Sequence, residues 1–120
     1  MPNAILRAFV NSRNGLRSAW RDDASYRRAV WQVVAGVIIA TGLTFWLDMS
    51  TGRWLLLVAS LLPIIIVELL NTAIEAVTDK ASPERHPLAK KAKDIGSAAV
   101  LLTRLMTSLI WITVIFDTLF

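Results

Sequence analysis

The chain has 120 residues, 55% of them hydrophobic, and its mean hydropathy is +0.54. This apolar content exceeds that of an ordinary soluble domain and predicts one membrane domain over residues 1–120. The absence of cysteine excludes disulfide scaffolds, thiolate metal sites and cysteine nucleophiles. The net charge of +4 would suit nucleic acid, but the positions of the basic residues favour a membrane surface and no nucleic-acid partner.

Residues 5–28 form the first predicted element. Apolar residues fall within about 60° of arc on a helix, and basic and polar residues lie opposite them. The pattern predicts an amphipathic helix in the membrane interface, with Asp23 turned toward the bilayer or the bundle because it continues the apolar phase. The apolar residues are Ile5, Phe9, Leu16 and Trp20.

Three apolar segments follow, each long enough to cross about 30 Å of hydrocarbon as a helix. The predicted spans are residues 29–47, 54–79 and 94–117, with a loop over residues 80–93 between the second and the third. Pro63 is expected to kink the second span, because proline has no backbone N–H. Basic residues gather before the first span and in the loop, so the N-terminus and loop 80–93 are predicted to be cytoplasmic and the C-terminus to lie on the opposite side.

The second span carries an acidic stripe. Glu68, Asn71, Glu75 and Asp79 stand at i, i+3, i+7 and i+11, which places them within about 80° of arc on one helix face. Glu68 is expected to lie about 10 Å deeper than Glu75, which reaches the headgroup level. A carboxylate in hydrocarbon costs on the order of 2.5–3.5 kcal/mol, so the stripe favours a functional site over its alternative, a structural polar seam.

Lys93, Asp94 and Ser97 open the third span at the depth of Glu75 and Asp79. A cation beside carboxylates suits a nucleotide phosphate with its magnesium, whereas lysines that anchor the helix at the interface are an equally supported interpretation. The sequence has no glycine-rich phosphate loop and no soluble-kinase motif, so a phosphoryl-transfer site would be built from helices.

Two stretches of the chain resemble one known family. The signature region of the small integral-membrane diacylglycerol kinases of bacteria is similar to VELLNTAIEAVTDKASPERHPLAKKAKDIGSAAVLL, residues 67–102, and their N-terminal motif is similar to NGLRSAWRDDASYR, residues 14–27. The resemblance implies an all-α homotrimer with shared active sites in the bacterial inner membrane, each subunit having three transmembrane helices and one surface helix. It also implies transfer of the γ-phosphate of MgATP to the hydroxyl of diacylglycerol, giving phosphatidic acid.

The resemblance further assigns roles to residues. Glu68 matches the proposed general base, and Asn71 and Lys93 match the other catalytic positions. Asp23 and Glu75 match the ligands of Mg²⁺ on ATP. The positions that match nucleotide contacts are Asn11, Asp23, Glu75, Asp79, Glu84, Arg85, His86, Lys93 and Asp94. The positions that match lipid contacts are Arg17, Ser18, Ala19, Trp20, Asp48, Glu68, Ser97 and Trp111.

Three positions depart from the family pattern, because Asp23 replaces a glutamate, Asn11 an aromatic residue and Ala4 an arginine. An undecaprenol kinase with the same scaffold remains an alternative. A proton-linked transporter is a remote alternative, since the acidic residues lie toward one side of the membrane only. Arg104 interrupts the third span and is expected to face either a polar interior or a partner chain.

Overall fold

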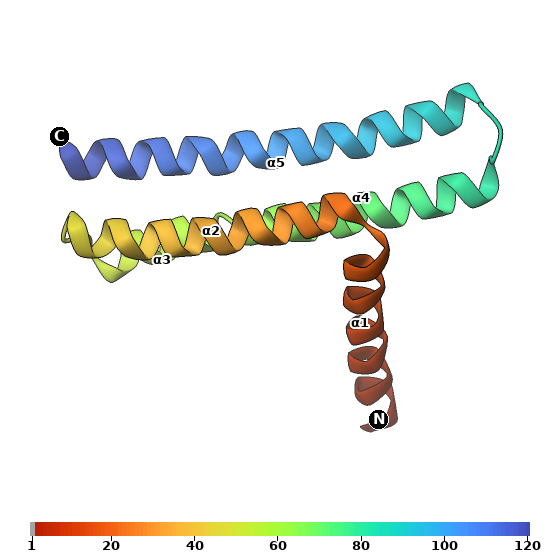
Figure 1. Cartoon of the computed structure of the whole chain (residues 1–120), viewed down its shortest axis with the longest axis horizontal. Coiled ribbons are helices and arrows are strands. Elements are labelled where there is room, and N and C mark those ends of the chain that lie inside the picture. Colours follow the sequence, from red (N-terminus) through yellow and green to blue (C-terminus); the bar gives the residue numbers. More distant parts are fainter. Residues whose placement is uncertain (1) are drawn as a thin grey trace.

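The computed structural model describes residues 2–120, which are almost entirely helical. The helices of this part of the chain are α1 (Pro2–Asp22), α2 (Ala24–Trp46), α3 (Thr51–Ala59), α4 (Leu62–Ala81) and α5 (Pro87–Leu119). Figure 1 shows α2, the α3–α4 pair and α5 running along the long axis, whereas α1 leaves them transversely. The predicted all-α fold, with one N-terminal helix apart from a bundle of long helices, is confirmed.

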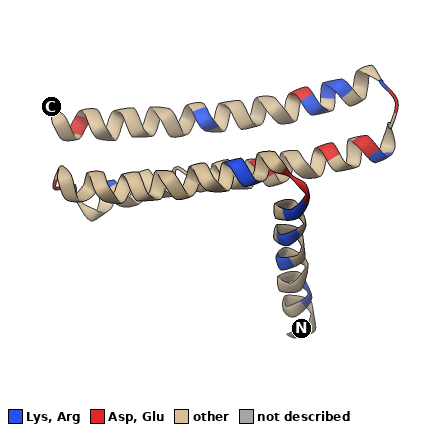
Figure 2. Cartoon of the chain, in the orientation of Figure 1, with Lys and Arg blue, Asp and Glu red and all other residues tan. Residues whose placement is uncertain are grey.

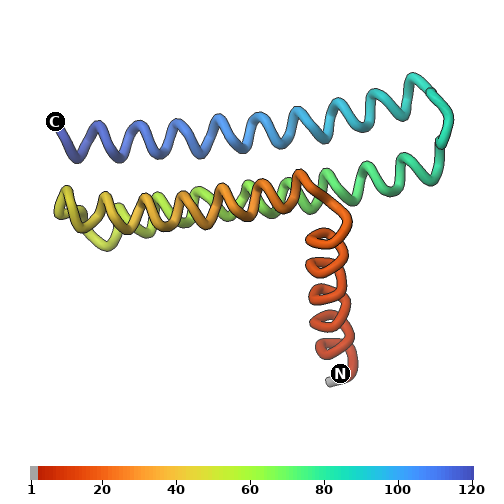
Figure 3. The backbone as a smooth tube through the Cα atoms, viewed as in Figure 1, coloured from red at the N-terminus to blue at the C-terminus, as the bar shows by residue number. Residues whose placement is uncertain are grey.

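The described residues contain three helical segments that are long and apolar enough to cross a membrane: Ala24–Trp46, Thr51–Ala81 and Pro87–Leu119. The tube in Figure 3 shows how the chain passes through them in turn. At about 1.5 Å per residue, the 33 residues of α5 extend about 50 Å and therefore project beyond a hydrocarbon layer of about 30 Å.

The long loop predicted over residues 80–93 is wrong, because the segment between α4 and α5 is non-helical only from Ser82 to His86. Pro87 stands in the first turn of α5, where its missing N–H is not needed. The Nδ1 atom of His86 accepts a hydrogen bond from the backbone N–H of Leu88 at 3.1 Å and caps the helix. The lysines predicted to lie in the loop are therefore on a helix.

The single helix predicted over residues 5–28 is also wrong, since α1 ends and α2 begins on either side of Asp23. The backbone of Asp23 is extended (φ −121°, ψ 110°), and its Oδ1 accepts hydrogen bonds from the backbone N–H groups of Ser25 at 2.8 Å and Tyr26 at 3.2 Å. Aspartate is a favoured N-terminal cap because it satisfies free N–H groups in this way. We call this bend the elbow.

The kink expected at Pro63 is a short break between α3 and α4, where Ser60 and Leu61 form a turn. Side chains from α5 bridge it. The hydroxyl of Thr107 donates to the Ser60 carbonyl at 2.8 Å, and the indole Nε1 of Trp111 donates to the Leu57 carbonyl at 3.3 Å and to the Ser60 hydroxyl at 3.1 Å. Backbone groups freed by proline in an apolar segment thereby regain partners.

A stripe of small residues on α2 lets the helices approach closely. Ala29 and Ala40 are fully buried, and a Cβ on Gly36 would lie 2.8 Å from Cδ1 of Leu61. Outside this contact most large apolar side chains are exposed, and only 11% of the most apolar 18-residue stretch of α5 is buried within the chain. The remaining surface suits lipid or further subunits.

Candidate functional site

The predicted acidic stripe lies on α4 and passes from a buried to an exposed position. Glu68 and Asn71 are buried, with 5% and 9% of their surface exposed, Glu75 is half-buried and Asp79 is exposed. Figure 2 shows acidic segments along the C-terminal part of α4 and basic segments at the start of α5. The stripe therefore leads from the interior of the bundle to the charged end near the α4–α5 loop.

Glu68 is enclosed by side chains from α2 and α5. Its Oε1 lies 3.6 Å from Nη2 of Arg104, and its Oε2 accepts a hydrogen bond from the Ser25 hydroxyl at 3.4 Å. Nη1 of Arg104 in turn donates to Oε1 of Gln32 at 2.6 Å. A buried carboxylate requires such partners. Arg104 therefore contacts polar groups in the interior of its own chain, which is the first of the two arrangements expected for it.

Asn71 is held by its neighbours on α4 and α5. Its Nδ2 donates to Oε1 of Glu75 at 3.4 Å, while its buried Oδ1 has no hydrogen-bond partner among the described residues. A Cβ on Gly96 would overlap this oxygen, so the missing side chain at Gly96 lets the amide fit between the helices. The sequence pattern does not identify Gly96 as a site residue, because its role depends on the register of α5 against α4.

The elbow is fastened to α4 by Asp23. Its Oδ2 accepts a hydrogen bond from the Thr72 hydroxyl, and its Oδ1 accepts one from the Ser25 hydroxyl at 2.9 Å. Burial favours a raised pKa for Asp23, but the hydrogen bonds from Thr72, Ser25 and the Tyr26 backbone outweigh it and hold the pKa below its usual value. The carboxylate is consequently ionised at neutral pH.

A hollow of about 870 Å³, the elbow hollow, lies between the elbow and α4. Asp23 and Glu75, the two predicted metal ligands, both line it, as do Ser18 and Ala19. Residues 2–120 contain no group of three or more His, Cys, Asp or Glu side chains that could hold a metal. Two carboxylates nevertheless fit magnesium, which proteins commonly hold through one or two carboxylates together with nucleotide phosphates.

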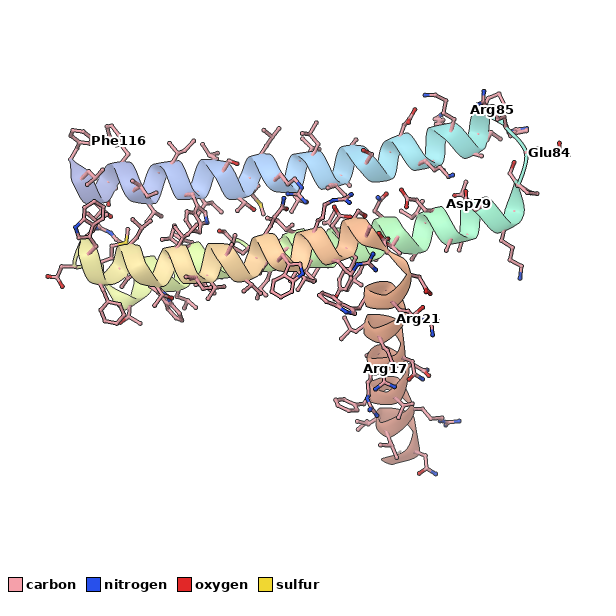
Figure 4. The ribbon with its side chains drawn as sticks, viewed as in Figure 1. Arg17, Arg21, Asp79, Glu84, Arg85 and Phe116 are labelled. Carbon is pink, nitrogen blue, oxygen red and sulfur yellow. The ribbon has the colours of Figure 1, made fainter. Side chains whose placement is uncertain are left out.

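A second hollow of about 740 Å³, the loop hollow, lies at the α4–α5 loop. Asp79 lines both hollows, and Figure 4 shows it with Glu84 and Arg85 at this end of the molecule. Lys93 pairs with Asp79, and Nζ of Lys90 pairs with Asp94 at 2.6 Å. The predicted nucleotide-binding residues that line the loop hollow are Asp79, Glu84, Arg85, His86, Lys93 and Asp94.

Other predicted residues lie outside the two hollows. Asn11 and Arg17 are exposed on α1, and Ser97 is exposed on α5. Trp20 packs edge-on against Trp31, with ring centroids 6.1 Å apart. These positions remain predictions for the nucleotide or the lipid.

Asp48 follows the end of α2, and Trp111 lies at the α3–α4 break. The backbone of Asp48 has a φ of 52°, and the indole N–H of Trp111 is occupied at the break. No hydrogen bond or ion pair within residues 2–120 joins either residue to Glu68. Their predicted role at the lipid remains a prediction.

Four polar contacts of the site escape prediction from the sequence, those of Ser25, Gln32, Thr72 and Arg104. Gln32 and Arg104 carry a recognisable signal, since each is a strongly polar residue inside an apolar span. Ser25 and Thr72 carry no such signal, because small hydroxyl residues commonly donate to their own helix backbone.

Comparison with known proteins gives one consistent family. The family model described as prokaryotic diacylglycerol kinase matches residues 10–115. A diacylglycerol kinase of Escherichia coli (strain K12) is 41% identical over 107 residues, which cover 89% of this chain and 84% of that protein. Its counterpart in Pseudomonas aeruginosa (strain PAO1) is 42% identical over 111 residues, covering 92% and 87%. That of Haemophilus influenzae (strain Rd) is 34% identical over 112 residues, covering 93% and 92%.

Proposed function

The chain belongs to the prokaryotic diacylglycerol kinase family and is an ATP-dependent lipid kinase, and we propose that it transfers the γ-phosphate of MgATP to diacylglycerol, giving phosphatidic acid. One observation carries the proposal: the acidic stripe joins the buried Glu68 to Asp79, which lines both hollows. A nucleotide bound near Asp79 would lie at the exposed end of the stripe. A lipid hydroxyl at the buried end would meet the carboxylate of Glu68.

The loop hollow supplies the groups that a triphosphate needs. Lys93 and Arg85 would offset phosphate charge, and phosphate oxygens would compete with Asp79 for Lys93. Asp23 and Glu75 would hold Mg²⁺, which neutralises charge on the nucleotide phosphates when it is bound. We expect the neighbouring His86 and Asp94 to contact the nucleotide as well.

Glu68 is the proposed general base. As the hydroxyl oxygen of diacylglycerol bonds to the γ-phosphorus, the bond from that phosphorus to the ADP oxygen breaks and the hydroxyl proton passes to Glu68. Ser25 and Arg104 hold the carboxylate, and one turn along α4 Asn71 donates a hydrogen bond to Glu75. Phosphoryl transfer of this kind depends mainly on positioning and charge.

The proposal includes a homotrimer with shared sites in the bacterial inner membrane, with the N-terminus and the α4–α5 loop in the cytoplasm. Basic residues concentrate on α1 and around that loop, as the positive-inside rule requires of a cytoplasmic side. The large apolar surface that α5 leaves uncovered supports assembly with further subunits.

The test is phosphoryl transfer by the purified protein in mixed micelles. We expect radiolabel from the γ-position of ATP in phosphatidic acid when magnesium and a 1,2-diacylglycerol are present. Undecaprenol in a parallel reaction tests the other lipid class. Absence of labelled phosphatidic acid from correctly assembled protein would refute the proposal, and labelling of undecaprenol alone would replace the substrate.

A further inference from the structure

Arg104 is a cation within the apolar part of α5 and lies at the depth of Glu68. Its Nη2 is 3.6 Å from Oε1 of Glu68, and its Nη1 donates to Gln32 at 2.6 Å. The Arg104 side chain is 36% exposed and Gln32 is exposed, so both are accessible from the surface of the chain. An arginine in a membrane span is energetically costly and marks a functional position.

This part of the site has more donors than acceptors. The guanidinium carries further N–H groups beyond the one given to Gln32, and at 3.6 Å its contact with Glu68 is an ion pair longer than a hydrogen bond. The amide N–H groups of Gln32 have no acceptor among the described residues. Hydrocarbon provides no water for such groups, and a lipid that reaches this edge of the site would supply the acceptors that they lack.

The proposed substrate carries suitable acceptors next to its hydroxyl. The ester carbonyls of diacylglycerol accept hydrogen bonds and lie on the same short glycerol unit as the hydroxyl that is to be phosphorylated. With that hydroxyl at Glu68, the esters fall beside Arg104 and Gln32. A polyprenol or a dialkylglycerol presents a hydroxyl without any ester carbonyl.

We propose that Arg104 and Gln32 form a donor site for the ester carbonyls of the lipid substrate. The two residues thereby select a diacyl lipid over lipid alcohols that lack esters. The inference rests on the proposed function and identifies which feature of its substrate this site recognises. Arg104 also has a second role, since it holds the carboxylate of Glu68.

The test compares a 1,2-diacylglycerol with the 1,2-dialkylglycerol of the same chain length. We expect wild-type kcat/KM to favour the diester by about tenfold, the size of a charge-assisted hydrogen bond. Arg104→Met is expected to bring the ratio of the two kcat/KM values close to one, mainly through a higher KM for the diester. Because both lipids are measured on one preparation, the ratio does not depend on the folded fraction.

Arg53→Met is the matched control. It removes an arginine whose Nη2 pairs with Asp117 at 2.5 Å, remote from Glu68, and it should leave the ratio unchanged. Gln32→Leu leaves the Arg104–Glu68 ion pair in place and should lower the ratio by a smaller factor. If Arg104→Met does not fold, the ratio measured for Gln32→Leu serves as the test.

The outcomes separate this inference from the proposed function. A wild-type protein that phosphorylates diester and diether equally well overturns the donor site while the kinase remains. Equal losses on both lipids in Arg104→Met overturn it too, because Arg104 would then act only through Glu68. A wild-type protein that phosphorylates no lipid alcohol removes the proposed function, and this inference with it.

Discussion

Thr72 on α4 donates a hydrogen bond to Asp23, the residue that ends α1 and caps α2. One side chain thus fixes the position of the transverse helix relative to the acidic stripe. The same carboxylate lines the elbow hollow, where it is a proposed magnesium ligand. Local folding and the proposed metal binding would therefore depend on the same carboxylate.

Replacing Thr72 by valine should loosen the elbow. Loss of the hydrogen bond to the charged Asp23 is expected to lower stability by about 1–2 kcal/mol. The pKa of Asp23 is lowered in the folded state. Its contribution to stability is therefore complete above the unfolded pKa of about 3.9, and it is lost as the pH falls through the lower pKa of the folded state. The free energy of unfolding should therefore differ less between about pH 7 and about pH 3 in Thr72→Val than in the wild type.

Thr103→Val is the control for this prediction, because the Thr103 hydroxyl donates only to the carbonyl of Ala99 on its own helix. It should leave the pH difference unchanged. A Thr72→Val protein with the pH difference of the wild type would show that Thr72 does not stabilise the Asp23 carboxylate.

Glu68→Gln should abolish most turnover, since the amide cannot accept the hydroxyl proton. General-base removal typically lowers kcat by about 10²- to 10⁴-fold, and the KM for MgATP should change little because Glu68 is not one of the proposed nucleotide or magnesium contacts. Steady-state kinetics with saturating diacylglycerol measure both. Asp117→Asn makes the same chemical change at the other end of the bundle and should keep normal turnover. Near-normal kcat in Glu68→Gln would exclude Glu68 as the base.

Glu75→Gln should raise the magnesium concentration required for half-maximal activity by roughly tenfold, because it removes a charged oxygen ligand. Magnesium titration at fixed ATP gives the value. Asp22 also lines the elbow hollow but is paired with Arg21 at 3.0 Å, so Asp22→Asn should leave the titration almost unchanged. An unaltered titration in Glu75→Gln would remove Glu75 from the metal site.

Gly96→Ala should displace Asn71, since the added methyl group overlaps the buried amide oxygen. We expect a stability loss of about 1–3 kcal/mol together with a lower kcat. Gly42→Ala is the control, because nothing lies within 4 Å of a Cβ there, and it should stabilise the helix by about 0.5–1 kcal/mol. If Asn71→Ala restores the stability of Gly96→Ala, the overlap is the cause; additive losses would argue against it.

Hydropathy and helical periodicity predict the spans and the stripe, because both depend on residues within one helix. The ends of the helices are harder to predict. The segment from Pro87 to Lys93 resembles a loop by its charge, yet a proline in the first turn and good helix formers start α5 there. Asp23 continues the periodic pattern of apolar residues in α1, but its side chain caps α2 and the first helix ends before it.

The partners across helices could not be predicted in detail. Arg104 meets Glu68, and Gly96 meets Asn71, only when α5 is placed in one register against α4. Composition and spacing within a single helix contain no information on that register. Six of the predicted nucleotide residues nevertheless line the loop hollow, since they are close in sequence on both sides of a short loop.

The break between α3 and α4 has a mechanical consequence. Thr107 and Trp111 of α5 bridge it, and along the backbone only the turn hydrogen bonds around Ser60 and Leu61 connect α3 to α4. We therefore expect α3 to tilt independently when the bilayer becomes thicker or thinner. The proposed catalytic carboxylate, Glu68, would keep a constant distance from the aqueous boundary, and the enzyme would tolerate membranes of differing width.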